Sequence, residues 1–153
     1  RERICTYGPS YGGYAALMAA AREPALYRCA VGYVGVYDLP MRRDDLPHGA
    51  RWMGTYANEW MGDSDEALAL LSPNRIADRI KAPVFLAAGG KDEIAPLAHS
   101  HKMEKALKAA GTPVETLYFP TEGHGFYTPE HQREFYTRLL DFLGRHLGGK
   151  TAG

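Results

Sequence analysis

The 153-residue sequence lacks several features that would point to a particular class of protein. Its 18 lysine and arginine residues balance 18 aspartate and glutamate residues, so we expect no nucleic-acid partner and no anionic membrane surface. No apolar run approaches the roughly 20 residues that span a bilayer. There is no Cys/His cluster, no His-Glu-x-x-His and no Gly-x-x-x-x-Gly-Lys-Ser/Thr, so we expect no metal site and no cofactor.

Cysteine is scarce, and its two occurrences, Cys5 and Cys29, both lie in apolar runs of the strand type. We interpret them as buried free thiols, while a disulfide between adjacent strands stays open. Cysteine usage therefore leaves the compartment undecided, and we expect a soluble protein of the cytoplasm or the periplasm. No signal peptide is visible. The chain opens on Arg1-Glu2 directly before a strand, as expected if this sequence is part of a longer protein.

Strand-like and helix-like segments alternate along a chain whose length fits one domain. We expect strands over 3–7, 28–34, 82–88 and 114–119, and helices over 13–22, 65–71, 74–80, 96–110 and 129–147, with one or two short amphipathic helices within 51–61. Residues 41–49 are expected to form a loop and 148–153 a flexible tail. Alternation of this kind predicts an α/β fold with a parallel sheet of about four strands flanked by helices.

The first strand runs into Gly8-Pro9-Ser10-Tyr11-Gly12-Gly13-Tyr14, and an alanine-rich helix follows. A strand, Gly-x-Ser-x-Gly and a helix together form the context of a nucleophile elbow, a strained turn that projects the serine hydroxyl from the sheet. We expect side chains at Gly8 and Gly12 to collide with the neighbouring strand and helix, so glycine is needed at both positions. The backbone N–H of Tyr11 would point to where a substrate oxyanion forms. A glycine-rich turn with an idle serine is the alternative.

Two further polar residues follow later strands, Asp92 after the third and His124 after the fourth. The carboxyl ends of parallel strands lie at one edge of a sheet, so we expect both side chains to meet Ser10 there. The order Ser, Asp, His is that of the α/β-hydrolases. We predict that Ser10 attacks a carbonyl carbon, that His124 transfers the proton, and that Asp92 orients and stabilises the imidazolium.

Other roles for these residues stay open. Asp92 could cap the helix that begins near Pro96, and His124 could be a turn residue between two glycines. Asp38, after the second strand, is a competing carboxylate. None of the remaining histidines follows a strand, so we interpret them as solvated: His48, His99, His101, His131 and His146.

At these positions the sequence resembles the prolyl oligopeptidase family of serine peptidases. The family's elbow typically reads Gly-x-Ser-Tyr-Gly-Gly-Tyr, as residues 8–14 do. The resemblance covers 3–147, through Tyr37-Asp38-Leu39 and the segments 59–62, 72–73, 80–84, 89–96 and 122–126. It implies that 3–147 is the C-terminal part of an α/β-hydrolase domain, one that cleaves short peptides through an acyl-enzyme.

The resemblance also implies a pocket for the residue before the scissile bond. The matching positions are apolar or aromatic, so a small or apolar residue is expected there. Two positions depart from the family: the acid loop usually opens with His-Gly and here reads Ala88-Gly89, and a usual valine is Ala95. The pocket residues implied are Tyr11, Val36, Leu39, Ile94 and Ala95.

A longer parent protein is implied as well, because the family's hydrolase domain has about eight strands and some 250 residues. The earlier strands, a tyrosine hydroxyl that serves as second oxyanion donor and an N-terminal propeller are absent from this sequence. We expect the first strand to have a bare edge through which the chain forms a homo-oligomer. We also expect weak catalysis, because loss of one oxyanion donor costs about a hundredfold.

Two other functions compete with the peptidase. A carboxylesterase would use the same three residues, although the Tyr-Gly-Gly-Tyr elbow and the 59–83 region favour the peptidase. A non-catalytic scaffold domain is disfavoured by the presence of the serine, the aspartate and the histidine together.

Overall fold

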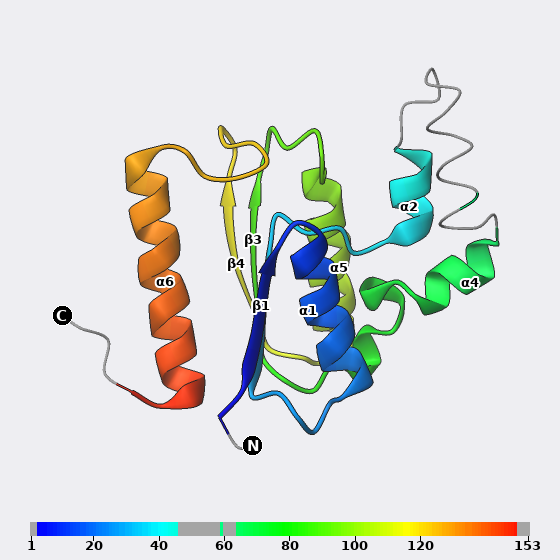
Figure 1. The fold of residues 1–153 in the computed structure, drawn as a ribbon, viewed down its shortest axis with the longest axis horizontal. Helices are drawn as coiled ribbons and strands as arrows, with labels where there is room; N and C mark the ends of the chain where they lie inside the picture. Colours follow the sequence, from blue (N-terminus) through cyan, green and yellow to red (C-terminus); the bar gives the residue numbers. More distant parts are fainter. Residues whose placement is uncertain (1–2, 46–58, 60–63, 150–153) are drawn as a thin grey trace.

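The computed structural model describes residues 3–45, 59 and 64–149. Its four strands are β1 (Cys5–Pro9), β2 (Cys29–Tyr33), β3 (Val84–Gly89) and β4 (Val114–Phe119). The helices are α1 (Tyr11–Arg22), α2 (Leu39–Asp44), α4 (Asp65–Leu70), α5 (Leu97–Ala109) and α6 (Pro129–Leu147), with the 3₁₀ helices η1 (Pro73–Arg75) and η2 (Ala77–Arg79). Helix α6 covers one face of the sheet, and α1 and α5 cover the other (Figure 1).

The strands form one parallel sheet in the order β1-β2-β3-β4, which confirms the predicted α/β fold. Each of the first three strands is followed by a crossover that returns the chain to the same end of the sheet, so all four strands run in the same direction. The segments after β1, β3 and β4, which carry Ser10, Asp92 and His124, therefore leave the sheet at the same edge.

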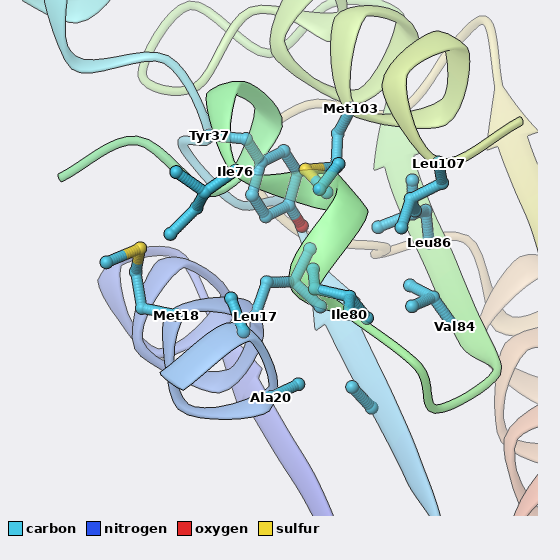
Figure 2. Close-up of a cluster of buried hydrophobic side chains, with 13 residues drawn as sticks. Leu17, Met18, Ala20, Tyr37, Ile76, Ile80, Val84, Leu86, Met103 and Leu107 are labelled. Atoms are coloured by element: carbon cyan, nitrogen blue, oxygen red, sulfur yellow. The ribbon is translucent and has the colours of Figure 1, made fainter. Parts of the chain in front are cut away.

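Two apolar clusters hold the helices on the sheet. On the α1 and α5 side, Leu17, Leu86 and Met103 are fully buried around Tyr37 (Figure 2). On the α6 side, Phe85, Phe135 and Phe142 pack together. Strand β3 contributes to both clusters and is buried along its whole length, which explains its uninterrupted apolar sequence.

A short helix replaces part of the loop expected over 41–49. Helix α2 begins after Asp38, whose side chain accepts a hydrogen bond from the Met41 N–H at 3.0 Å, and Pro40 lies in its first turn. Asp38-Leu39-Pro40 is thus a helix start that the charged composition of the following residues obscured. The one or two short helices expected within 51–61 lie outside the described residues, apart from Glu59.

The helix expected over 74–80 is also wrong, because the segment forms the two 3₁₀ turns η1 and η2. Ser72 does not cap it: its hydroxyl donates to the Leu68 carbonyl at 2.7 Å and accepts from the Leu39 N–H at 2.8 Å. The Asn74 side chain donates to Asp38 at 2.8 Å. Tertiary hydrogen bonds have taken the place of a regular helix here.

The two cysteines are joined in a disulfide, which corrects the interpretation as free thiols. Cys5 and Cys29 are partners in the register of β1 and β2, with their Cα atoms 4.6 Å apart. This separation lies within the range that a disulfide bridges. The register of two strands cannot be predicted from an apolar sequence. Here the register places Cys5 opposite Cys29, and this allows the disulfide to form.

Within residues 3–45, 59 and 64–149, no helix combines the length and the apolar character needed for a membrane span. The same part of the chain contains no group of three or more His, Cys, Asp or Glu side chains arranged to hold a metal ion.

Candidate active site

Ser10 occupies a sharp turn between β1 and α1. Its φ of 56° and ψ of −122° lie outside the regions that an L-residue prefers, so the backbone there is strained. The Ser10 N–H donates to the Tyr33 carbonyl of β2 at 2.8 Å, which fixes the turn to the sheet. A Cβ atom at Gly8 would collide with the carbonyl group of Gly12, so a tight strand-to-helix turn requires glycine at that position.

The loop after β3 holds Asp92 in a defined orientation. Its Oδ1 atom accepts hydrogen bonds from the Ile94 N–H at 2.9 Å and the Ala95 N–H at 2.8 Å. The side chain is fully buried. The loop's own backbone therefore orients this carboxylate, with Oδ2 left for another donor.

The loop after β4 carries His124 between Gly123 and Gly125, which form an isolated antiparallel bridge. Two contacts position this loop from outside. The Phe126 N–H donates to the Tyr33 hydroxyl at 2.6 Å, and the Tyr33 ring stacks on Phe135 of α6. Burial and the neighbouring tyrosines raise the Tyr33 pKa to about 12, so the hydroxyl stays neutral over the working pH range of most enzymes.

These loops bring Ser10, Asp92 and His124 into direct contact. His124 Nε2 lies 2.9 Å from Ser10 Oγ, and Nδ1 lies 2.8 Å from Asp92 Oδ2 and 3.1 Å from Oδ1. An ionised carboxylate only accepts hydrogen bonds, so Nδ1 carries the ring proton and donates a hydrogen bond to Asp92. In the neutral imidazole Nε2 is then an acceptor, placed to receive the hydroxyl proton of Ser10.

The competing carboxylate, Asp38, lies in a different network. Besides capping α2 it accepts from Asn74 at 2.8 Å and pairs with Arg75 at 3.2 Å and Lys102 at 3.5 Å. Burial acts to raise its pKa, but the hydrogen bonds and the two cations outweigh burial and lower it. Asp38 thus anchors the segment after β2 to η1 and α5.

Three of the histidines predicted to be solvated are buried or partly buried, namely His99, His131 and His146. His99 is fully buried in α5, where its Nδ1 atom accepts from the Tyr37 N–H at 3.2 Å and the Asp38 N–H at 3.3 Å. His131 is partly buried and its Nδ1 lies 2.7 Å from Glu122 Oε1. Both face the protein because of helix packing, which single-residue reasoning does not reveal. His101 is exposed and His146 partly buried, while His48 lies outside the described residues.

A cavity of about 410 Å³ opens beside Ser10. Four of the five predicted pocket residues line it, and Ala95 does not: it is buried, and its N–H binds Asp92. Helix packing adds residues that the sequence analysis missed. Tyr14 could have been predicted, because it belongs to the elbow motif and lies one helical turn after Ser10. No such indication exists in the sequence for Arg42, Leu68 and Leu71. The lining residues within 3–45, 59 and 64–149 are Ser10, Tyr11, Tyr14, Val36, Leu39, Arg42, Leu68, Leu71 and Ile94.

Tyr11 is the first residue of α1, directly after Ser10. The first N–H groups of a helix have no carbonyl partner within the helix. Its side chain is exposed and lines the cavity.

A parallel sheet with a strained elbow serine in contact with a histidine–aspartate pair defines the α/β-hydrolase class. Comparison with known protein families agrees with this class and identifies the family. The model of the prolyl oligopeptidase family, a family of peptidases, matches residues 1–150, and the chain belongs to this family.

Individual relatives are peptidases that are much longer than this chain. A dipeptidyl aminopeptidase BIII from Pseudoxanthomonas mexicana is 33% identical over 157 residues, covering 99% of this chain and 23% of that protein. An acylaminoacyl peptidase structure from Pyrococcus horikoshii, 27% identical, superposes with a TM-score of 0.86 and covers 100% of this chain and 25% of its own. A puromycin-hydrolyzing peptidase from Mycobacterium tuberculosis is 28% identical with a TM-score of 0.86, covering 96% and 22%. The chain therefore spans about a quarter of the length of these relatives.

Proposed function

We propose that this chain carries the catalytic residues of a serine peptidase that hydrolyses short peptides through an acyl-enzyme. One observation carries the proposal: His124 contacts Ser10 Oγ through Nε2 at 2.9 Å and Asp92 through Nδ1 at 2.8 Å. This is the geometry in which a histidine removes the serine proton while a carboxylate fixes the tautomer. Membership of a peptidase family supports the same chemistry.

The reaction has two steps. Ser10 Oγ forms an ester bond with the substrate carbonyl carbon while His124 Nε2 takes its proton and returns it to the leaving amine as the C–N bond breaks. Water, deprotonated by the same nitrogen, then attacks the ester carbon, and His124 passes the proton to Ser10 Oγ as the bond between Oγ and the acyl carbon breaks and the acid leaves. Asp92 stabilises the imidazolium in both steps. The Tyr11 N–H, at the start of α1, stabilises the oxyanion.

The names of the relatives support a peptide as the substrate, and the mainly apolar lining of the cavity supports contact with the carbon chain of the residue before the scissile bond. The disulfide between Cys5 and Cys29 favours the periplasm over the cytoplasm, because disulfides persist in oxidising compartments.

Paired substrates separate this proposal from a carboxylesterase. The chain should hydrolyse both acetyl-Ala-Leu-p-nitroanilide, an amide, and the matching p-nitrophenyl ester, and Ser10→Ala should abolish both activities. Hydrolysis of the ester alone would make the chain an esterase. Equal hydrolysis by the wild type and Ser10→Ala would remove Ser10 from the reaction.

A further inference from the structure

Nine of the residues that the structure describes line the cavity beside Ser10, and among these nine only Arg42 carries a charged side chain. Arg42 and Leu39 are three residues apart on α2 and both face the cavity, as the spacing of one helical face requires. The other lining residues in the described part of the chain are Ser10, two tyrosines and five aliphatic residues. A guanidinium in such a wall is the strongest polar feature available to a bound substrate.

A hydrogen bond holds the guanidinium close to the reacting residues. Arg42 Nη1 donates to the Ile94 carbonyl at 2.9 Å. The N–H of the same Ile94 donates to Asp92 Oδ1 at 2.9 Å. Arg42 is therefore tied to the loop that carries Asp92. Its guanidinium has five N–H donors in a planar fork, so one bond to a carbonyl leaves most of them available.

Neighbouring cations are paired with carboxylates in a way that Arg42 is not. Arg43 pairs with Asp44 and Asp65, and Arg75 and Lys102 pair with Asp38. Within residues 3–45, 59 and 64–149, Arg42 has no such partner. A carboxylate that binds beside this cation in a partly dehydrated cavity can form charge-assisted hydrogen bonds, which are stronger than hydrogen bonds between neutral groups.

We propose that Arg42 is a specificity-determining residue that binds the carboxylate of an acidic side chain, with the substrate residue before the scissile bond being glutamate or aspartate. The proposal rests on the proposed function, since the cavity counts as a substrate pocket only if Ser10 is the nucleophile. It revises the expectation of a purely apolar preference: the apolar walls contact the methylene groups, and Arg42 pairs with the terminal charge.

Binding to an inactive chain tests this without any need for turnover. Acetyl-Ala-Glu-amide and acetyl-Ala-Gln-amide have nearly the same shape and differ in charge. Titrated into the Ser10→Ala chain, the glutamate peptide should bind about tenfold more tightly than the glutamine peptide. Adding Arg42→Gln should remove this difference, so that the two peptides bind with equal affinity. Arg42→Lys, which keeps the charge but not the fork, should retain part of it.

Arg43→Gln is the matched control, because Arg43 is the next residue of α2, does not line the cavity and should leave the preference intact. A preference for glutamate that survives Arg42→Gln would overturn the proposal. So would equal affinity for the two peptides in the Ser10→Ala chain, or no binding of the glutamate peptide at about 10 mM. Circular dichroism establishes that each variant is folded.

Turnover by the chain with Ser10 intact separates failure of this proposal from failure of the proposed function. The substrates are p-nitroanilides with glutamate, glutamine or leucine before the scissile bond. The glutamate substrate should have a larger kcat/KM than the glutamine substrate, and Arg42→Gln should make these two kcat/KM values equal. Cleavage of the leucine substrate without a glutamate preference would sink the role of Arg42 and leave the peptidase standing. Cleavage of none would count against the peptidase, while the binding experiment still decides the role of Arg42.

Discussion

The carbonyl of Glu122 accepts a hydrogen bond from the Lys91 N–H at 2.8 Å, and this bond joins the loop of Asp92 to the loop of His124. A second main-chain bond, from the Gly90 N–H to the Phe119 carbonyl at 2.8 Å, lies beside it. A Cβ atom at Gly89 would collide with the carbonyl of Glu122, so glycine permits this approach. The distance between the acid and the histidine is thus set by backbone contacts as well as by their own hydrogen bond.

Glu122 should be a positioning residue for the histidine loop. Its buried carboxylate accepts from the N–H groups of Tyr127 and Thr128, both at 3.0 Å, and contacts His131. In Glu122→Gln the side-chain NH2 group replaces one carboxylate oxygen and faces N–H groups that then lack an acceptor. This change should lower the unfolding free energy by about 1–3 kcal/mol. We expect a lower kcat with little change in KM, because the loop that carries His124 loses its support. Urea unfolding and steady-state kinetics measure the two effects.

The same change should alter the pH dependence of stability. Burial acts to raise the pKa of Glu122, but hydrogen bonds from Thr128, Tyr127 and His131 outweigh it and lower the pKa to about 2. The folded-state pKa lies below the ordinary value of 4.5, so this stabilisation is full above about pH 4.5 and is lost as the pH falls toward 2. Glu122→Gln should lack that component, whereas Glu134→Gln, an exposed change on α6, should keep it. Identical acid profiles for Glu122→Gln and the wild type would contradict the assignment.

Asp92 and Asp38 form a matched pair of buried carboxylates with different roles. Asp92→Asn should reduce kcat by about 10⁴, because an amide in place of the carboxylate favours the wrong imidazole tautomer. Asp38→Asn weakens the pairs with Arg75 and Lys102, so it should lower stability and leave the reactivity of Ser10 in the folded fraction nearly unchanged. Labelling rates with a small fluorophosphonate, corrected for the folded fraction, distinguish the two. Equal losses in both variants would refute the division of roles.

His99 should make the chain sensitive to mild acid. Burial lowers its pKa against the opposing attraction of Asp45 and Asp38, and Arg42 acts in the same direction as burial. Because the folded-state pKa lies below the unfolded value of 6.5, the unfolded state takes up the proton first, and stability falls as the pH drops below about 6.5. His99→Gln should flatten the unfolding free energy between about pH 5 and 7. His101→Gln, on the same helix but exposed, should not.

The outer edge of β1 should mediate self-association. Within the described residues β1 pairs with β2 alone and lies at one end of the sheet order. A strand with unpaired backbone groups pairs readily with another chain. Tyr7 of β1 is 45% exposed, and Tyr7→Lys should shift the chain toward monomer, whereas Leu70→Lys on α4 should not. Sedimentation velocity gives the answer, and a wild-type monomer at every concentration would count against the prediction.

The parts of the molecule that the sequence predicted are those that depend on local pattern. The strand–elbow–helix at Ser10 is specified by consecutive residues, because the glycines, the apolar strand and the alanine-rich helix each act over a few positions. The loops of Asp92 and His124 could be placed because parallel strands bring their carboxyl ends to one edge. The alternation of helix and strand then predicted the sheet.

The errors concern contacts between residues far apart in the sequence. The disulfide of Cys5 and Cys29 depends on strand register, and the burial of His99 depends on which face of α5 meets the segment after β2. The sequence predicts a helix over 74–80, but Ser72, just before it, makes tertiary hydrogen bonds to Leu39 and Leu68. Arg42 faces the cavity only because α2 exists, and a charged stretch did not predict that helix. No pattern of neighbouring residues contains this information.

Fluorophosphonate labelling of Ser10 tests the central claim most directly. The wild-type chain should form a covalent adduct at Ser10, Ser10→Ala should form none, and His124→Ala should react at least about a hundredfold more slowly because its serine keeps its proton. Mass spectrometry of the modified peptide identifies the site, and circular dichroism shows that each chain is folded. A folded wild-type chain that stays unlabelled, or labelling that persists in Ser10→Ala, would contradict the account.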